Sequence, residues 1–271
     1  MSGADPWGVE DTRDWWRWTN LDESWIAEVD GEAAAFGALL DRGEHAAYFA
    51  SVDPRYGGRG ISTTLLRRAE QRARELGSPK LTAGMFSENT AARRLLERLG
   101  FWEVRRFYHM QIDFDSPRRP PNAPTASLFR RSGRRMRTRS TGRWRKRWPT
   151  TGDTSTVGFD EWKRRRLEAP ETDVSLWFIA RSGDEIAGVL RGDARQHGGG
   201  WIGMLGVRPA WRRRGIANAL LRHAFAEYHR RGEPHVGLGV DTQNPSGATR
   251  LYERAGMRVT TENVVFEKKL T

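Results

Sequence analysis

The chain has 271 residues, 37% of them hydrophobic, and this length predicts two domains, each with a core of its own. It contains no cysteine, no HExxH motif, no i, i+4 histidine pair and no apolar run near twenty residues. These absences exclude disulfides and give no support for a metal site or a membrane partner. The net charge is +12, which favours a polyanionic partner only where the charge is spread over a folded surface. We therefore expect a soluble, cytoplasmic protein.

The first part of the chain alternates predicted strands with predicted helices. Two apolar stretches flank Asp30-Gly31, which is a hairpin signal. In chain order the predicted elements are strands over 25–29, 34–40 and 46–52, a helix over 61–76, a strand over 79–83, a helix over 90–99 and closing strands to residue 114. This alternation predicts an α/β fold with helices packed on the faces of one mixed sheet.

Residues 116–156 break this pattern, because they have no sustained periodicity of 2 or 3.6. Twelve cations and no acid lie between Arg118 and Arg147, while the other 34 basic residues balance the 34 acidic ones. The net charge therefore belongs to this segment. High charge with little apolar content predicts a disordered basic linker. Nucleic acid is an expected partner only if the segment from Arg118 to Arg147 is functional.

A second hypothesis for residues 125–156 is a shifted reading frame. If Thr141–Ser155 is back-translated with G/C-rich codons and read in a frame displaced by two nucleotides, the resulting peptide has the pattern of an acidic amphipathic helix. Such a helix is expected before a second domain. Trp144 followed by Arg145 allows only Glu or Ala in that frame. The sequence leaves both hypotheses open, and the coding nucleotide sequence compared in both frames decides between them.

An internal duplication divides the chain. Residues 52–62 align with residues 207–217 at an offset of 155, and residues 95–101 align with residues 251–257 at an offset of 156. The predicted elements repeat from residue 176 to residue 270. This self-similarity predicts an N-terminal domain over 1–115, the basic irregular linker over 116–156 and a C-terminal domain over 157–271.

The second copy contains a basic glycine loop between a strand and a helix. The apolar run Trp201–Val207 is followed by the loop Arg212–Ala217, and a helical pattern begins at the glycine, Gly215. The first amides of a helix have no intrahelical partner and carry the positive end of its dipole, so a phosphate can bind there. Glycine lets the backbone approach the ligand, and the arginines add charge. The loop matches neither a P-loop nor a Rossmann motif, so neither a nucleoside triphosphate nor NAD is supported.

The predicted elements of Trp201–Met257 follow one another in the order strand, [QR]xxGx[GA] loop, helix, strand, Asn and helix with Tyr. In this order the stretch resembles the acetyl-CoA-binding core of the GNAT superfamily of N-acetyltransferases. The loop positions are Arg212, Gly215 and Ala217, and LYERAGM at 251–257 matches the family's LYxxxGF. With two fused copies, the chain looks like the mycothiol synthase branch of that superfamily. The resemblance implies two tandem GNAT-type domains, each a mixed, mostly antiparallel sheet flanked by helices.

The resemblance also implies the reaction, which is transfer of acetyl from acetyl-CoA, as co-substrate, to a primary amine of a small molecule by direct attack. Tyr252 would be the general acid that protonates the leaving thiolate. The strand backbone would pair with the pantetheine arm, the loop amides would hold the pyrophosphate, and the asparagine would contact the pantetheine. The implied cofactor-binding residues are Leu205, Gly206, Val207, Arg212, Arg213, Arg214, Gly215, Ile216, Ala217 and Asn244. We expect a monomer or a homodimer.

The first copy differs where the chemistry would happen. Gly57 stands at the position of Arg212, and Leu96 stands at that of Tyr252. Leucine cannot transfer a proton, so we predict a degenerate domain with a structural or regulatory role. Whether it binds acetyl-CoA stays open. The residues of its candidate second cofactor site are Val52, Gly57, Gly58, Arg59, Gly60, Ser62 and Asn89.

The general base is not identified by the sequence. Many relatives carry a Glu on the strand before the loop, but residues 200–205 include no carboxylate. Asp241 and Glu185 are candidates that would act through water, and a turn or surface role is the alternative for each. A catalytically silent acyl-CoA-binding or regulatory protein is the second hypothesis for the whole chain. A polyanion-binding protein that uses the arginine-rich segment is the third.

Overall fold

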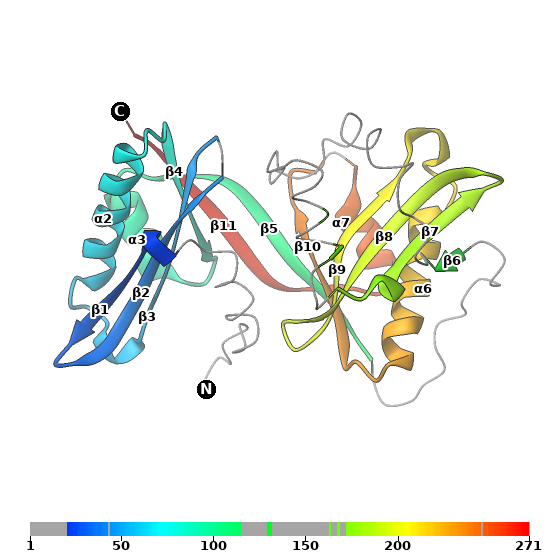
Figure 1. Ribbon diagram of the computed structural model, residues 1–271, viewed down its shortest axis with the longest axis horizontal. Helices are drawn as coiled ribbons and strands as arrows, with labels where there is room; N and C mark the ends of the chain where they lie inside the picture. Colours follow the sequence, from blue (N-terminus) through cyan, green and yellow to red (C-terminus); the bar gives the residue numbers. More distant parts are fainter. Residues whose placement is uncertain are drawn as a thin grey trace. The chain divides into compact units, whose positions relative to one another are not determined.

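The computed structural model describes residues 21–42, 44–114, 129–131, 163, 167–168, 172–244 and 246–270. Figure 1 shows its helices and strands. In chain order the elements are η1 (Leu21–Glu23), β1 (Ser24–Val29), β2 (Glu32–Asp41), β3 (Ala46–Val52), η2 (Pro54–Tyr56), α2 (Ile61–Glu75), β4 (Lys80–Phe86), α3 (Thr90–Arg98), β5 (Trp102–Asp113), β6 (Phe129–Arg131), η4 (Val174–Leu176), β7 (Trp177–Ser182), β8 (Glu185–Gln196), β9 (Gly199–Val207), η5 (Pro209–Trp211), α6 (Ile216–Arg230), β10 (His235–Asp241), α7 (Ala248–Arg254) and β11 (Arg258–Lys269).

The chain folds into two compact units, and each is described by itself. The N-terminal unit contains the described residues up to Phe107 together with those after Thr260. The C-terminal unit runs from Tyr108 to Thr260. Each unit therefore includes part of β5 and part of β11.

The N-terminal unit is a mixed sheet in the order β1-β2-β3-β4-β11, with the first part of β5 beyond β11. β3 and β4 are parallel, and the other neighbours from β1 to β11 are antiparallel. Helix α2 packs on this sheet through Leu66, Ala69 and Ala73, which are buried with Leu39 and Leu81. The i, i+3, i+7 spacing of the helical residues places them on one face, which explains why this segment folds as an amphipathic helix.

Strand β11, from the end of the chain, completes the N-terminal unit. Residues 263–269 pair antiparallel with residues 80–86 of β4, and Val264 and Phe266 are buried in the core of this unit. The sequence predicts that the first copy is closed by its own strands up to residue 114; the strand β5 is present there, but β11 lies between it and β4. The pattern of a half-buried strand is the same whichever sheet it joins, so the sequence alone does not reveal this pairing.

The C-terminal unit is a mixed sheet in the order β5-β10-β9-β8-β7-β6. β9 and β10 are parallel, while β6, β7, β8 and β9 pair antiparallel in turn. Helix α6 contributes Leu220, Leu221 and Phe225 to the core, where they are buried with Phe178 and Ile202. This helix links the glycine loop at its start to the middle of the sheet.

Three residues of the basic segment form a strand. Residues 129–131 are β6 and pair antiparallel with residues 178–180 of β7. The sequence predicts no regular element here, because three residues are too short to show a periodicity. The rest of the predicted linker, including the stretch in the frameshift hypothesis, lies outside the described residues.

The duplication predicted from the sequence is visible in the order of elements. The series β2-β3-η2-α2-β4-α3 in one unit repeats as β8-β9-η5-α6-β10-α7 in the other. Each unit is a mixed, mostly antiparallel sheet flanked by helices, so the predicted α/β fold class is confirmed. Within the described part of the chain, no helix has the length and apolarity needed to cross a membrane.

Candidate functional site

Strand β9 has a strand partner along only part of one side. On the first side it pairs with β8 over nearly its whole length. On the other side, the described parallel pairs with β10 involve only Gly200 and Trp201. In the described sheet, the backbone of residues 205–207 therefore has no pairs with β10. Unpaired amide and carbonyl groups inside a sheet are suited to bind an extended ligand that carries amides of its own.

The glycine loop ends in an open helix N-terminus. The first i→i−4 bond of α6 runs from the amide of Ala219 to the carbonyl of Gly215 at 3.0 Å, so the amides of residues 216–218 precede the intrahelical ladder. Gly215 has a φ of 78°, which disfavours a side chain. A Cβ at this position would meet no atom of the described residues within 4 Å. The need for glycine therefore comes from its backbone conformation, and the space beside it is open.

The arginines of the loop place positive charge at this helix end. Arg212 Nε donates to the carbonyl of Val207 at 3.2 Å, which ties the loop to the end of β9. Arg213 adopts a φ of 63°, a left-handed conformation that few residues other than glycine adopt. Arg213 and Arg214 are exposed. The helix dipole and these cations favour the same ligand, an anion.

The N-terminal unit repeats the backbone of this loop with one arginine, Arg59, in place of three. Helix α2 begins at Gly60, whose φ of 80° and ψ of −2° match the 78° and −2° at the start of α6. However, Asp53 binds the guanidinium of Arg55 at 2.8 Å, and Glu32 accepts a hydrogen bond from the Tyr56 hydroxyl at 2.7 Å. These carboxylates next to the loop disfavour an anion there.

The other residues of the candidate second cofactor site have local roles. Arg59 lies over the Tyr56 ring at 5.3 Å, and the Asn89 oxygen accepts from the amide of Ala92 at 2.9 Å to cap α3. The remaining members lie at the end of β3 (Val52), in the loop (Gly57 and Gly58) and in the first turn of α2 (Ser62).

Tyr252 is buried in α7, with 9% of its surface exposed. Burial raises the pKa of its hydroxyl to about 12. Among the described residues, none forms a hydrogen bond with this hydroxyl. Tyr252 packs in the same hydrophobic cluster as Leu205 of β9 and Ile216 at the start of α6, so the structure brings the three predicted parts of the site together. Leu96, its counterpart in α3, is also buried.

Asn244 lies in the turn between β10 and α7. Its side-chain oxygen accepts from the amide of Ser246 at 2.9 Å, and its own amide donates to the carbonyl of Asp241 at 3.1 Å. The oxygen is therefore engaged within the turn. The side-chain nitrogen is the part of Asn244 that can donate to a ligand carbonyl.

The two candidate bases have the turn and surface positions given as alternatives above. Asp241 is buried at the end of β10, where its carboxylate accepts from the amide of Gln243 at 2.8 Å. Glu185 is exposed at the first position of β8, beside the hairpin turn. Neither position supports a direct role in proton transfer.

The family model described as the Acetyltransferase (GNAT) family matches residues 2–101 and 134–257, which is more than half of the chain. The chain belongs to the GNAT family. The two matched regions correspond to the two copies, so the tandem GNAT organisation recognised in the sequence is confirmed.

This GNAT acetyltransferase is similar to characterised and solved proteins over most of its length. A mycothiol acetyltransferase from Thermobispora bispora is 26% identical over 252 residues, which cover 88% of this chain and 81% of the relative. The crystal structure of a GCN5-related N-acetyltransferase from Sphaerobacter thermophilus is 32% identical, with a TM-score of 0.81 over 97% of this chain and 86% of that one. A tandem GNAT protein from the clavulanic acid biosynthesis pathway shares the fold, with a TM-score of 0.62 at 15% identity over 92% and 82% of the two chains.

Three residues of this GNAT acetyltransferase that motif matching misses lie close to β9. Arg191 and Asp193 are charged residues of β8, and Tyr228 is a fully buried residue of α6. The signal that the sequence offers for the two β8 residues is the pair of opposite charges, Arg191 and Asp193, that follows the apolar run of β8. No motif covers that strand, so only the fold relates it to the loop and to Tyr252.

Proposed function

We propose that this protein is an acetyl-CoA-dependent N-acetyltransferase that uses its C-terminal unit to acetylate a primary amine of a small molecule by direct attack. The observation that carries the proposal is the combination, in one unit, of an open helix N-terminus, a partly unpaired strand and a buried tyrosine. The N-terminal unit has the same helix start but an aliphatic side chain at the tyrosine position.

The proposed co-substrate site follows the backbone. Residues 205–207 of β9 would pair with the amides of the pantetheine arm, and the amides at the start of α6 would bind the pyrophosphate. Arg212, Arg213 and Arg214 would add charge at the phosphates, and the side-chain nitrogen of Asn244 would donate to a pantetheine carbonyl. Acetyl-CoA itself supplies the acetyl group as an activated thioester.

Tyr252 would be the general acid. With its pKa raised to about 12, its hydroxyl is protonated at neutral pH, which is the state in which an acid must begin. The burial that raises this pKa also disfavours an unprotonated thiolate beside it. The hydroxyl has no partner among the described residues and can therefore donate to the leaving sulfur.

The second candidate function is a catalytically silent acyl-CoA-binding or regulatory protein. It is favoured by the N-terminal unit, which keeps the backbone of the loop around Gly60 but has Leu96 in place of an acid. For that unit we propose a structural or regulatory role without catalysis.

A thiol-release screen tests the proposal. The full chain is incubated with acetyl-CoA and a panel of small primary amines, and free thiol is measured with a chromogenic reagent. Because the chain contains no cysteine, all the thiol measured comes from the product. We expect thiol release that depends on one class of amine, with the acetylated amine identified by mass spectrometry.

The same protein is heated with and without acetyl-CoA to separate the alternatives. A raised melting temperature without thiol release for any amine would support the silent acyl-CoA-binding function. The absence of both effects would contradict acetyl-CoA binding altogether.

A further inference from the structure

Strand β9 contains a β-bulge at Gly203. Arg191 of β8 pairs with Met204, and Gly192 pairs with Ile202, so Gly203 is an extra residue between two pairs. The corresponding strands of the N-terminal unit, β2 and β3, pair in seven consecutive steps without such a shift. A bulge re-aims neighbouring side chains and is frequent beside active sites. This one lies between the paired and the unpaired parts of β9.

The space above the bulge is filled by two charged side chains. A Cβ placed on Gly203 would lie 2.1 Å from Nη2 of Arg191 and 2.5 Å from Oδ2 of Asp193. These two groups lie 3.4 Å apart, with side chains 15% and 26% exposed. The Nε of Arg191 is buried and has no hydrogen-bond partner among the residues that the structure describes. The guanidinium of Arg191 and the carboxylate of Asp193 together thus occupy the position that a side chain of β9 itself would take.

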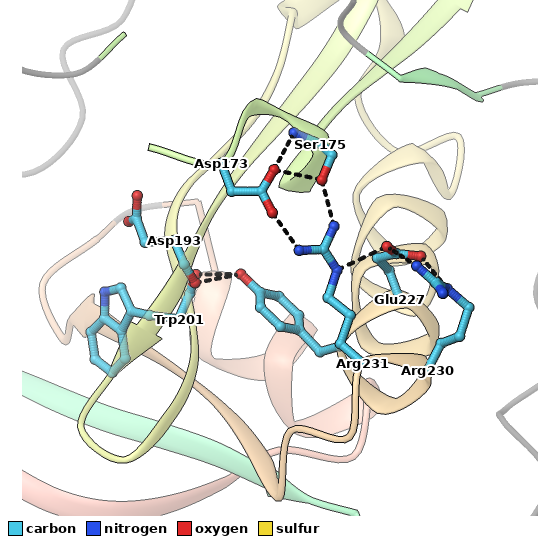
Figure 2. Close-up of polar contacts among 8 residues, drawn as sticks. Asp173, Ser175, Asp193, Trp201, Glu227, Arg230 and Arg231 are labelled. Atoms are coloured by element: carbon cyan, nitrogen blue, oxygen red, sulfur yellow. Dashed lines mark hydrogen bonds and ion pairs between the residues drawn. The ribbon is translucent and has the colours of Figure 1, made fainter. Parts of the chain in front are cut away.

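Asp193 points away from helix α6. A Cβ on Gly192 or on Gly200 would collide with Tyr228, which comes from that helix. Successive side chains of a strand alternate between faces, so Asp193 and its cross-strand partner Trp201 point to the opposite face. In Figure 2 both side chains extend away from the helix.

An aromatic wall lies on the same face. The Trp201 indole covers Gly237 of β10, whose Cβ would lie 2.8 Å from the ring. The rings of His109 and His197 lie 5.4 Å and 4.7 Å from that of Trp201. Burial, and secondarily the charge of His197, lower the pKa of His109 to about 4, so His109 is uncharged at neutral pH. Among the side chains of this face named here, Asp193 is therefore the anion, beside three aromatic rings and Arg191.

The N-terminal unit provides an internal comparison. Arg191, Asp193 and Trp201 belong to the unit that also contains Tyr252. In the N-terminal unit, Ala38 of β2 pairs with Phe49 of β3, and Leu40 pairs with Ala47. Ala38, Leu40 and Ala47 therefore stand at the register positions of Arg191, Asp193 and Trp201. The unit that lacks a tyrosine in its last helix thus also lacks the charged pair and the indole. The three differences occur together.

We propose that Asp193 binds the ammonium group of the acceptor and takes its proton, with Arg191 holding the carboxylate over Gly203. This inference rests on the proposed function and supplies the base that the motifs do not identify. A carboxylate beside an indole attracts an alkylammonium through both charge and the ring face.

The ammonium gives one proton to Asp193, and the freed nitrogen lone pair forms a bond to the thioester carbonyl carbon. The carbon–sulfur bond then breaks, and sulfur leaves with its electron pair and takes a proton from Tyr252. The nitrogen loses its second proton as the intermediate collapses, which restores Tyr252, and Asp193 returns the first proton to water. One ammonium and one thioester give one amide, one thiol and one released proton.

Steady-state kinetics with an amine accepted in the screen provide the first test. Asp193→Asn should lower kcat/KM for the amine by about 10²-fold or more, and leave the KM for acetyl-CoA unchanged. Asp193→Glu keeps the carboxylate and should retain more activity than Asp193→Asn. Asp184→Asn, the same substitution at an exposed residue of the preceding turn, is the control and should behave like the wild type.

Gly203→Ala separates position from charge. It keeps the carboxylate but puts a methyl group where Arg191 and Asp193 lie, so both side chains must move. We expect a loss of kcat/KM for the amine with a folded protein, checked by circular dichroism and thermal melting. Wild-type kcat/KM in both Asp193→Asn and Gly203→Ala would overturn the assignment.

Direct binding keeps the test independent of turnover. Butylammonium chloride is titrated into the wild type and into Asp193→Asn, with butanol as the uncharged control, and the indole N–H signal of Trp201 is followed by NMR. We expect the ammonium to bind the wild type at least tenfold more tightly than the variant. Equal binding to the two proteins, or binding to neither, would overturn the assignment. Selective binding without acetyl transfer to any amine would instead contradict the proposed function and leave the ammonium site standing.

Discussion

The hydroxyl of Tyr228 lies 2.9 Å from the carbonyl oxygen of Asp193 and 2.8 Å from that of Trp201. Tyr228 is fully buried in α6, the helix that begins at the glycine loop. Its hydroxyl therefore fixes the backbone of β8 and β9 beside the bulge. One helix connects the proposed phosphate site at its first turn with the proposed amine site beside its last turns.

Tyr228→Phe should destabilise the C-terminal unit. The change leaves two buried carbonyl groups without this donor, which costs roughly 1–3 kcal/mol of unfolding free energy. Urea denaturation of the variant and the wild type measures this difference. Tyr252→Phe is the matched control, because the described residues form no hydrogen bond with its hydroxyl. Equal losses of stability in the two variants would contradict the role given to Tyr228.

Tyr252→Phe should instead affect the reaction. If Tyr252 protonates the leaving thiolate, its replacement should lower kcat by about 10²- to 10⁴-fold and leave acetyl-CoA affinity unchanged. Turnover is measured by thiol release, and affinity is measured by calorimetry. Tyr56→Phe, at a half-buried tyrosine of the N-terminal unit, controls for loss of a hydroxyl. Unchanged turnover in Tyr252→Phe would remove this residue from the role of acid.

Gly215→Ala and Gly60→Ala form a matched pair that reports which loop binds acetyl-CoA. The two glycines have φ values of 78° and 80°, and a Cβ at either would meet no atom within 4 Å in the part of the chain that the structure describes. Each substitution should therefore destabilise the protein by roughly 1–2 kcal/mol through the left-handed backbone alone. We expect only Gly215→Ala to raise the KM for acetyl-CoA. A raised KM in Gly60→Ala would show that the N-terminal unit takes part in turnover.

Asp173 should make stability depend on pH at low pH. Figure 2 shows its carboxylate between Ser175 and Arg231, and the same arginine binds Glu227 at 2.9 Å. Burial opposes ionisation of Asp173, but the hydrogen bonds from Ser175 and Arg231 outweigh it, so its pKa lies below the usual value. Because the pKa of Asp173 is lower in the folded state, its carboxylate stabilises the fold at pH values above the unfolded pKa of about 3.9. This contribution is lost as the pH falls through the pKa of the folded state. Asp173→Asn should thus lower the melting temperature at pH 7, and the difference should shrink towards pH 3. A difference that is constant with pH would contradict this account.

Phe266→Ala tests the place of the last strand. Phe266 is 1% exposed in the core of the N-terminal unit, and nearby Lys268 binds Glu70 of α2 at 2.8 Å. Truncation of a buried phenylalanine costs about 3–5 kcal/mol, so hydrogen exchange should accelerate in β4 and α2. Val259→Ala, at an exposed position of β11, is the control. Faster exchange confined to α6 and β9 would contradict the pairing of β11 with β4.

The sequence by itself determined the duplication, the α/β class, the helix start at Gly215 and the contrast between Tyr252 and Leu96. These features depend on local patterns, such as a strand period, a left-handed glycine or a motif of fixed spacing, and local patterns are readable in one chain. Their joint spacing also identified the family, which the comparisons confirm. The roles of the individual site residues stay predictions.

Only the tertiary structure decided which sheet β11 joins, where β9 bulges and what lies above Gly203. Strand pairing is non-local, and a half-buried strand carries the same alternation in either sheet. Asp193 and Gly203 are ten residues apart in the sequence and belong to no common motif. Their contact follows from the register of β8 and β9 and from the collision that a Cβ at 203 would cause. Strand β9 itself contains no carboxylate, but the fold places the carboxylate of Asp193, on the neighbouring strand β8, beside it.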